Sequence, residues 1–324
     1  MTTGDDLITA LASIQRGGTS GFDVIDIGSA PGFKIGRDDE NAVVLLTPAD
    51  KSPEPPTQLW RLSLDPSITL SVRFADGSEE RGEFGLIRLR LGEAEYLEPF
   101  LHVVANLIRI IGPDPSPGEV SIAMRRLVKL FDASPNPRGS VLGLWGELLV
   151  LCSTSDLTAI IDAWHADVDD RFDFAANGSR LEVKATTKME RQHIFSLEQL
   201  CPVPGASVSI ASIMTTETNA GTSVNDLIIR AERLLDNDPM RQMRIHEVVA
   251  QTLGAEWARH VDHRFDEEQG RETLVLLPAA GIPRVGDVPV QVTGVRFTAD
   301  CGHVVGELNP HGLAALIISN RAGE

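Results

Sequence analysis

One hairpin signal constrains the fold of this chain more than any other feature. Residues 171–184 read Arg-Phe-Asp-Phe-Ala-Ala-Asn-Gly-Ser-Arg-Leu-Glu-Val-Lys. The Asn177-Gly178 step at their centre favours a two-residue β-turn, because both positions tolerate the positive φ that this turn requires. Closing the turn pairs residue 174 with 181 and residue 173 with 182. The sequence therefore predicts two paired strands that place Asp173 opposite Glu182, with Lys184 on the same face.

The predicted pairing of Asp173 with Glu182 has an electrostatic cost. Facing side chains on paired strands have Cβ atoms about 4.5–5.5 Å apart, and like charges there destabilise the sheet. At an effective dielectric constant of about 20 the repulsion is roughly 3 kcal/mol, against a total stability of about 5–15 kcal/mol for a domain. A bound divalent cation would offset it. The alternative is a solvated lattice in which Arg171 and Lys184 compensate the two acids, and the hairpin alone leaves both interpretations open.

Residues 140–152 predict a buried helix, because their side chains are apolar almost all round. Glu147 is the only charged residue in this stretch. A buried carboxylate is unfavourable unless it takes up a proton, pairs with a cation or ligates a metal ion. The alternative is that Glu147 lies at the edge of the helix or pairs with Arg125 or Arg126 of the preceding helix.

A helix glutamate, then an aspartate, then Glu-x-Lys on the next strand resembles the PD-(D/E)XK nuclease superfamily, whose common core runs α-β-β-β-α-β. The chain is more closely similar to an uncharacterised bacterial family of PD-(D/E)XK motif proteins, whose genes often lie in phage-defence neighbourhoods. That similarity is carried by residues 143–151, Trp164, 172–174, 181–185 and 193–200, and it is most specific over residues 139–201. Phe172 stands where the proline that names the motif would be.

The resemblance implies an α+β fold with a restriction-endonuclease-like core and a divalent metal cofactor, Mg²⁺ or Mn²⁺. It assigns catalytic roles to Asp173, Glu182 and Lys184, and metal ligation to Glu147, Asp173 and Glu182. These assignments agree with the chemistry of the residues, since Mg²⁺ takes oxygen ligands from one or two carboxylates together with water and substrate phosphate. A bound ion lowers the pKa of a coordinated water and stabilises charge on the phosphate. The Lys184 ammonium can orient that water and contact the phosphate.

We therefore expect a Mg²⁺-dependent DNA endonuclease that hydrolyses phosphodiester bonds within a restriction or phage-defence system. DNA is its expected substrate and other subunits of a defence complex are its expected partners. The formal net charge of −17 argues against DNA binding by the chain alone, because such enzymes usually present a basic face. One alternative is an inactive nuclease-like subunit that acts as a protein or nucleic-acid binding scaffold. Another is an unrelated α/β protein whose charged hairpin is only a solvated ladder.

The remaining patterns predict three parts. Short strands between turns rich in Gly, Pro and Asp, followed by a helix over 95–111, indicate an N-terminal antiparallel β-domain over residues 1–112. The proline-rich run 112–118 is the expected linker to a nuclease-like core over 113–255. Within that core we expect a strand at 206–214, helices at 227–235 and 240–253, and either a helix or a strand at 157–164. A C-terminal extension, 256–324, has strand patterns at 272–277 and 290–298, and its docking partner stays open.

Composition points to a cytoplasmic protein. The three cysteines, Cys152, Cys201 and Cys301, are far apart in sequence and fit a reducing compartment as inert core thiols. The N-terminus carries Asp5 and Asp6 and no signal-peptide pattern. We also expect no membrane span, because the chain has no uninterrupted stretch of about 18 apolar residues.

Overall fold

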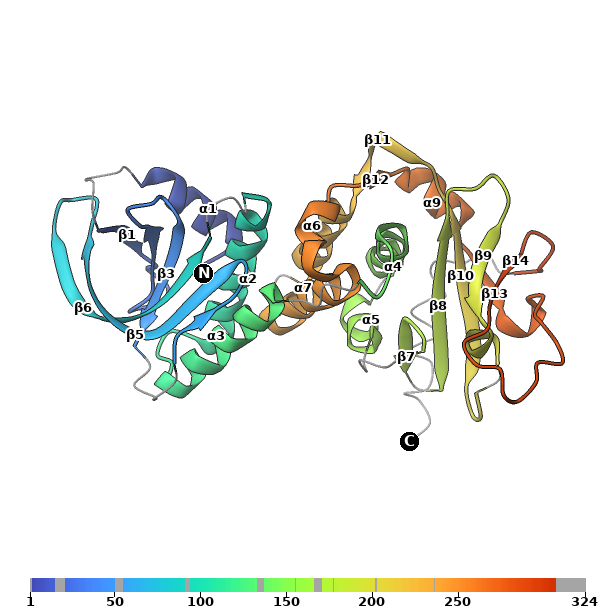
Figure 1. The fold of residues 1–324 in the computed structure, drawn as a ribbon. Coiled ribbons are helices and arrows are strands. Elements are labelled where there is room, and N and C mark those ends of the chain that lie inside the picture. Colours follow the sequence, from blue (N-terminus) through green and yellow to red (C-terminus); the bar gives the residue numbers. More distant parts are fainter. Residues whose placement is uncertain are drawn as a thin grey trace. The chain divides into compact units, whose positions relative to one another are not determined.

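The computed structural model of the chain describes residues 2–14, 21–49, 55–90, 94–132, 137–154, 156–165, 171–176, 178–201, 203–235 and 237–306. The chain forms two compact units, whose elements are drawn in Figure 1. The first comprises Met1–Pro137 and Gln242–Arg259, and the second comprises Arg138–Arg241 and His260–Glu324. Both units contain helices and strands, which confirms the predicted α+β class.

A curved six-stranded sheet forms the body of the first unit (Figure 1). Its order is β1-β2-β3-β6-β5-β4, and β1 also pairs with β5, which closes five of the strands into a small barrel. The β1–β5 pairing is parallel and the others are antiparallel, as predicted for this region. Val24, Leu46, Leu70, Val72 and Phe84 form one apolar cluster of this sheet. The strands are β1 (Phe22–Asp26), β2 (Lys34–Arg37), β3 (Val43–Pro48), β4 (Thr57–Gln58), β5 (Leu62–Arg73) and β6 (Glu79–Leu89).

Helices complete the first unit. They are α1 (Gly4–Ser13), η1 (Ala94–Tyr96), α2 (Leu97–Ile111), α3 (Pro117–Phe131), η3 (Gly254–Glu256) and, shared with the second unit along the chain, α7 (Pro239–Leu253) and α8 (Trp257–His260). An aromatic cluster joins distant segments, because the ring of Trp257 packs against Tyr96 and Phe131. The proline-rich run ends α2 and starts α3, where Ser116 caps the helix. The predicted domain boundaries at residues 112 and 255 stay a prediction.

A four-stranded mixed sheet organises the second unit (Figure 1). Its order is β13-β10-β8-β7, with β10 parallel to β8 and the two outer pairings antiparallel. The predicted strand at 206–214 is present as β10, and the predicted helices 227–235 and 240–253 are present as α6 and α7. The elements of this sheet and its helices are α4 (Val141–Ser153), α5 (Leu157–Ala163), β7 (Phe174–Ala176), β8 (Ser179–Thr186), β10 (Ser207–Met214), α6 (Val224–Leu234), α9 (Glu267–Thr273) and β13 (Val275–Pro278).

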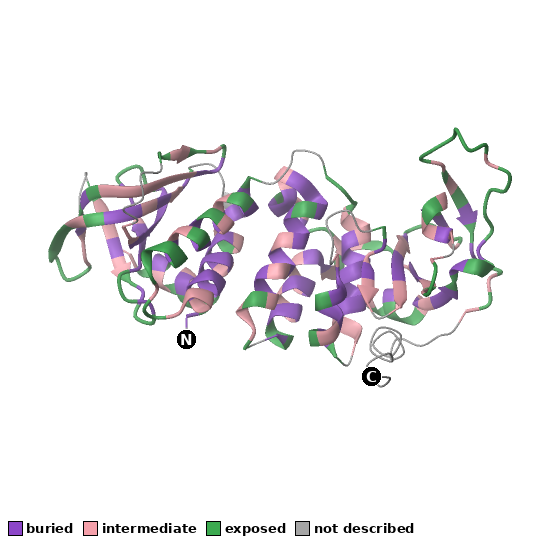
Figure 2. Ribbon diagram, turned by 90° about the horizontal axis from the view of Figure 1, so that it is seen from below, coloured by how far each residue is buried: buried purple, intermediate pink, exposed green. Residues whose placement is uncertain are grey.

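Helix α4 is surrounded by other elements of the second unit, which accounts for its apolar sequence. It contacts β8, α5, α6 and α9. Eight consecutive residues, Leu144–Leu151, are buried, and Figure 2 shows how buried residues gather along the packed helices. At Gly146 an added Cβ would lie 3.2 Å from Ala185 Cβ and 3.3 Å from Val183 Cγ1 of β8, so this glycine allows the helix to approach the sheet closely.

Two smaller sheets depart from the predicted pattern. Strand β9 (Gln192–Ser196) pairs with β14 (Arg296–Asp300), and β11 (Glu217–Ser223) pairs with β12 (Arg264–Phe265). Because β9 pairs with β14 instead of entering the four-stranded sheet, the α-β-β-β-α-β core stays a prediction. The expected strand at 290–298 was too long, since regular structure begins only at Arg296. The segment for which a helix or a strand was open is helical over Leu157–Ala163, and Leu197–Leu200 form a short 3₁₀ helix, η2.

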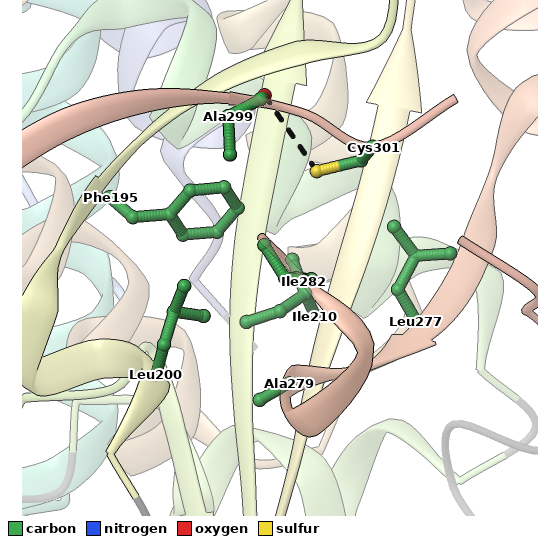
Figure 3. Close-up of a cluster of buried hydrophobic side chains, with 8 residues drawn as sticks. All are labelled: Phe195, Leu200, Ile210, Leu277, Ala279, Ile282, Ala299 and Cys301. Atoms are coloured by element: carbon green, nitrogen blue, oxygen red, sulfur yellow. Dashed lines mark hydrogen bonds between the residues drawn. The ribbon is translucent and has the colours of Figure 1, made fainter. Parts of the chain in front are cut away.

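The strands of the described C-terminal extension pair with strands of the second unit. Strand β13 pairs with β10, and both contribute to a buried cluster shown in Figure 3. This cluster consists of Phe195, Leu200, Ile210, Leu277, Ala279, Ile282, Ala299 and Cys301. All three cysteines are free thiols, and burial raises the pKa of the Cys152 thiol to about 12. Among the described residues, we find no helix that combines the length and apolar character needed to cross a bilayer.

Candidate metal centre

The hairpin register follows the turn predicted from sequence. Phe174 pairs with Leu181 and Ala176 with Ser179, and Gly178 has φ +76°. Asn177, the first turn residue, lies outside the described residues. The apolar side chains of the hairpin, Phe172, Phe174, Leu181 and Val183, are all buried.

Strand pairing of β7 with β8 ends at Phe174, so the expected backbone pairing of Asp173 with Glu182 is wrong. The reason is local. The Asp173 carboxylate itself accepts a hydrogen bond from the Val183 N–H at 2.6 Å. Its backbone carbonyl accepts another from the His165 N–H at 2.8 Å. Asp173 is thereby held against β8 by its side chain instead of by a β-ladder.

The Glu147 carboxylate of α4 lies close to the Asp173 carboxylate. Its side chain is only 9% exposed. Oε2 accepts a hydrogen bond from Trp164 Nε1 at 2.8 Å and lies 2.9 Å from His165 Nε2. Glu147 therefore neither lies at a helix edge nor takes the arginine partner considered above, and Arg126 forms its ion pair with Glu247.

The structure brings Glu147, Asp173 and His165 together. Each offers one ligand atom, and these atoms lie within 4.8 Å of one another. His165 Nε2 is 3.9 Å from Asp173 Oδ1. His165 was not among the residues predicted from sequence. The only signal for it was its place directly after Trp164, in a segment that carries the family resemblance.

Glu182 and Lys184 form the adjoining part of the cluster on β8. Lys184 Nζ donates to Glu182 Oε1 at 2.6 Å, and Glu182 is only 3% exposed. Gln199 Nε2 donates to the same Glu182 oxygen, while Gln199 Oε1 accepts from the Ser196 N–H at 3.0 Å. Gln199 was missed as a site residue, although Ser196-x-x-Gln199 has the capping-box pattern.

Burial and like charge act on the same carboxyl groups. Burial raises the pKa of Asp173 well above its usual range, and the neighbouring Glu182 and Glu147 raise it further. Burial also raises the pKa of Glu182, against the opposing effect of the Lys184 ammonium. The solvated lattice considered for the hairpin is therefore wrong for these acids. A buried cluster with this charge favours uptake of protons or of a cation.

The chain matches a family model over residues 15–301, and the family is described as "Putative PD-(D/E)XK family member, (DUF4420)". The chain belongs to this family. The membership confirms the resemblance recognised from the sequence motifs. No curated protein and no solved structure matches the chain.

The donor atoms of this cluster fit a divalent cation. PD-(D/E)XK nucleases usually use divalent metal ions, and carboxylate oxygens are the ligands that Mg²⁺ and Mn²⁺ take in proteins. Glu147 and Asp173 place their oxygens beside a histidine nitrogen, with Glu182 and Lys184 adjoining. A cation would relieve the repulsion that raises the pKa of Asp173.

Proposed function

We propose that this protein is a metal-dependent DNA endonuclease that works as a subunit of a restriction or phage-defence system. One observation carries the proposal. Three buried or partly buried carboxylates from separate segments, Glu147, Asp173 and Glu182, lie close together beside the Lys184 ammonium, and burial together with the neighbouring acids raises the pKa of Asp173 and of Glu182. A stable protein keeps such an arrangement only if something compensates it, and a divalent cation does so while supplying catalytic chemistry.

Each residue has a role in this proposal. Glu147, Asp173 and Glu182 would hold the ion, which supplies an acidified water and charge stabilisation when bound. Lys184 would hold the attacking water and the phosphate, since its ammonium is a compact donor of three hydrogen bonds. Gln199 would fix the Glu182 carboxylate, to which it donates. In the reaction, a water oxygen bonds to phosphorus and gives up one proton, the P–O bond to the leaving sugar oxygen breaks, and that oxygen takes up a proton.

The test of this proposal measures cleavage of circular and linear DNA by the purified protein, alone and with the products of its genomic neighbours. Glu182→Gln and Lys184→Met should each reduce cleavage by about 10²–10³-fold or more, the range for removing one preorganised charge-stabilising group. Glu198→Gln, which changes an exposed acid on η2, is the matched control and should leave cleavage unchanged.

The same variants distinguish the enzyme from the scaffold. Cleavage that survives Glu182→Gln would contradict the proposed active site. If partner subunits co-purify and protection against phage persists after Asp173→Ala, the protein acts as a nuclease-like scaffold instead.

A further inference from the structure

Among the described residues, Glu147, Asp173 and His165 form the candidate metal-binding group, and His165 supplies its nitrogen. Nε2 lies 2.9 Å from Glu147 Oε2 and 3.9 Å from Asp173 Oδ1. A simple ion pair needs one short contact to one carboxylate. Ligand atoms around a single six-coordinate ion, at about 2.1 Å from it, lie roughly 3–4 Å apart. The two observed distances fit that spacing.

An uncommon backbone conformation fixes the position of this imidazole. His165 has φ +42°, in the left-handed region that residues other than glycine rarely adopt. The conformation is fixed from several sides. The His165 N–H donates to the Asp173 carbonyl, Trp164 forms a β-bridge with Phe174, and Trp164 Nε1 donates to Glu147. Backbone strain of this kind persists where the surrounding structure over-determines it, and it gathers at functional sites.

The surroundings of His165 also suit a ligand. The Trp164 ring is fully buried, so the segment is anchored in the core. The His165 side chain remains 28% exposed, which leaves access for an ion from solvent. A histidine whose purpose was only to neutralise Glu147 would need neither the left-handed backbone nor the second carboxylate.

We infer that His165 is a nitrogen ligand of the metal centre and that it makes the site prefer Mn²⁺ to Mg²⁺. The inference rests on the proposed function and narrows its cofactor. Mg²⁺ is a hard cation that takes oxygen ligands and gives up water reluctantly. Mn²⁺ accepts the same carboxylates. As a first-row transition ion it is less hard than Mg²⁺, so it also gains from an imidazole nitrogen. His165 thus adds affinity for Mn²⁺ that Mg²⁺ does not share.

The test uses the full-length protein and Mn²⁺ itself as a spectroscopic probe. Electron spin echo measurements on bound Mn²⁺ detect a directly coordinated ¹⁴N nucleus, and competition titrations give the ratio of Mn²⁺ to Mg²⁺ affinity. The variant is His165→Asn, because asparagine also tolerates positive φ and so preserves the backbone. His263→Gln, which removes an exposed imidazole elsewhere in the second unit, is the control.

We expect wild type and His263→Gln to show the nitrogen signal. His165→Asn should lose it, with a fall of ~10-fold or more in Mn²⁺ affinity and a clearly smaller change for Mg²⁺. Bound Mn²⁺ without a nitrogen signal, or an unchanged affinity ratio in His165→Asn, would overturn the inference and leave the endonuclease proposal standing. If Asp173→Asn and Glu182→Gln also fail to weaken Mn²⁺ binding, the metal centre and the proposed function are both overturned.

Discussion

The burial and the negative charges of the site act together on the Asp173 side chain. Its carboxylate is largely buried, lies near two other acids and accepts a backbone hydrogen bond from Val183. The pKa of Asp173 is therefore raised in the folded protein. Since the folded state binds this proton more tightly than the unfolded chain, the stability gained from it is lost as pH rises through the folded pKa.

Asp173→Asn should stabilise the metal-free protein at pH 8, because the neutral amide removes the repulsion and can still accept from Val183. A gain of about 1 kcal/mol corresponds to roughly 2–4 °C in Tm for a domain of 150–250 residues. The gain should shrink towards pH 4, where wild-type Asp173 is protonated. Thermal unfolding with a chelator across this pH range measures it, with the exposed Asp262→Asn as control. A variant that melts lower than wild type at every pH would contradict the explanation.

At the residue level, sequence pattern was informative only where neighbours in space are also neighbours along the chain. The turn and strand alternation placed Asp173, Glu182 and Lys184 near one another without any structure. His165 and Gln199 could not be found this way. Their roles depend on where a left-handed residue and a short 3₁₀ turn aim the side chains.

Among the elements, α4 determines where the Glu147 carboxylate lies, because it carries Glu147 and packs directly on β8. Gly146→Val should overpack this contact, since its Cβ already falls within 3.3 Å of Val183 and Ala185. A loss of about 1–3 kcal/mol is expected. Gly118→Val in α3 is the matched control, because no atom lies within 4 Å of an added Cβ there. Urea denaturation compares the two, and equal midpoints would contradict the close approach of helix and sheet.

Strand β9 is attached to β10 through a buried polar contact, His193 Nε2 to Ser212 Oγ at 2.6 Å. Burial lowers the pKa of His193 from 6.5 to about 4. Below pH 6.5 the unfolded chain therefore takes up a proton that the folded protein refuses until about pH 4, so stability falls as pH falls through this window.

His193→Gln should remove this acid sensitivity. At pH 7.5 we expect it to be less stable than wild type by about 0.5–1.5 kcal/mol, the net value of a hydrogen bond. Between pH 6.5 and pH 4, the wild-type stability should fall relative to that of the variant by up to ~1.4 kcal/mol per pH unit, so that the wild type becomes the less stable of the two at the acidic end. Urea unfolding at several pH values gives both slopes. Parallel slopes would show that His193 titrates normally.

The pattern of elements was predictable where local signals dominate and not where distant segments meet. The all-apolar run predicted α4, and the helices expected at 227–235 and 240–253 are present as α6 and α7. The pairing of β9 with β14 joins residues about a hundred positions apart and has no local signal. Residues 290–295 have strand composition but no described strand partner, which is why that prediction was too long.

For the whole molecule, the net charge of −17 opposes binding to DNA, which is itself negatively charged. Each neutralised phosphate contributes a slope of about −0.9 to the dependence of log affinity on log salt. We expect the chain alone to bind DNA weakly, with a slope shallower than about −3, and a partner subunit to make it steeper. Fluorescence anisotropy over a salt series measures this. A steep slope for the isolated chain would show that it carries its own basic contact surface.

The connectivity of the two units has a further consequence for synthesis in the cell. Residues 242–259 belong to the first unit, yet the chain must pass through residues 138–241 of the second before reaching them. A nascent chain emerging from the ribosome cannot bring Trp257 to Tyr96 and Phe131 until then. The helical part of the first unit is therefore completed late, although the barrel strands all precede residue 90. A product truncated before residue 242 would expose this unfinished helical core to chaperones and proteases.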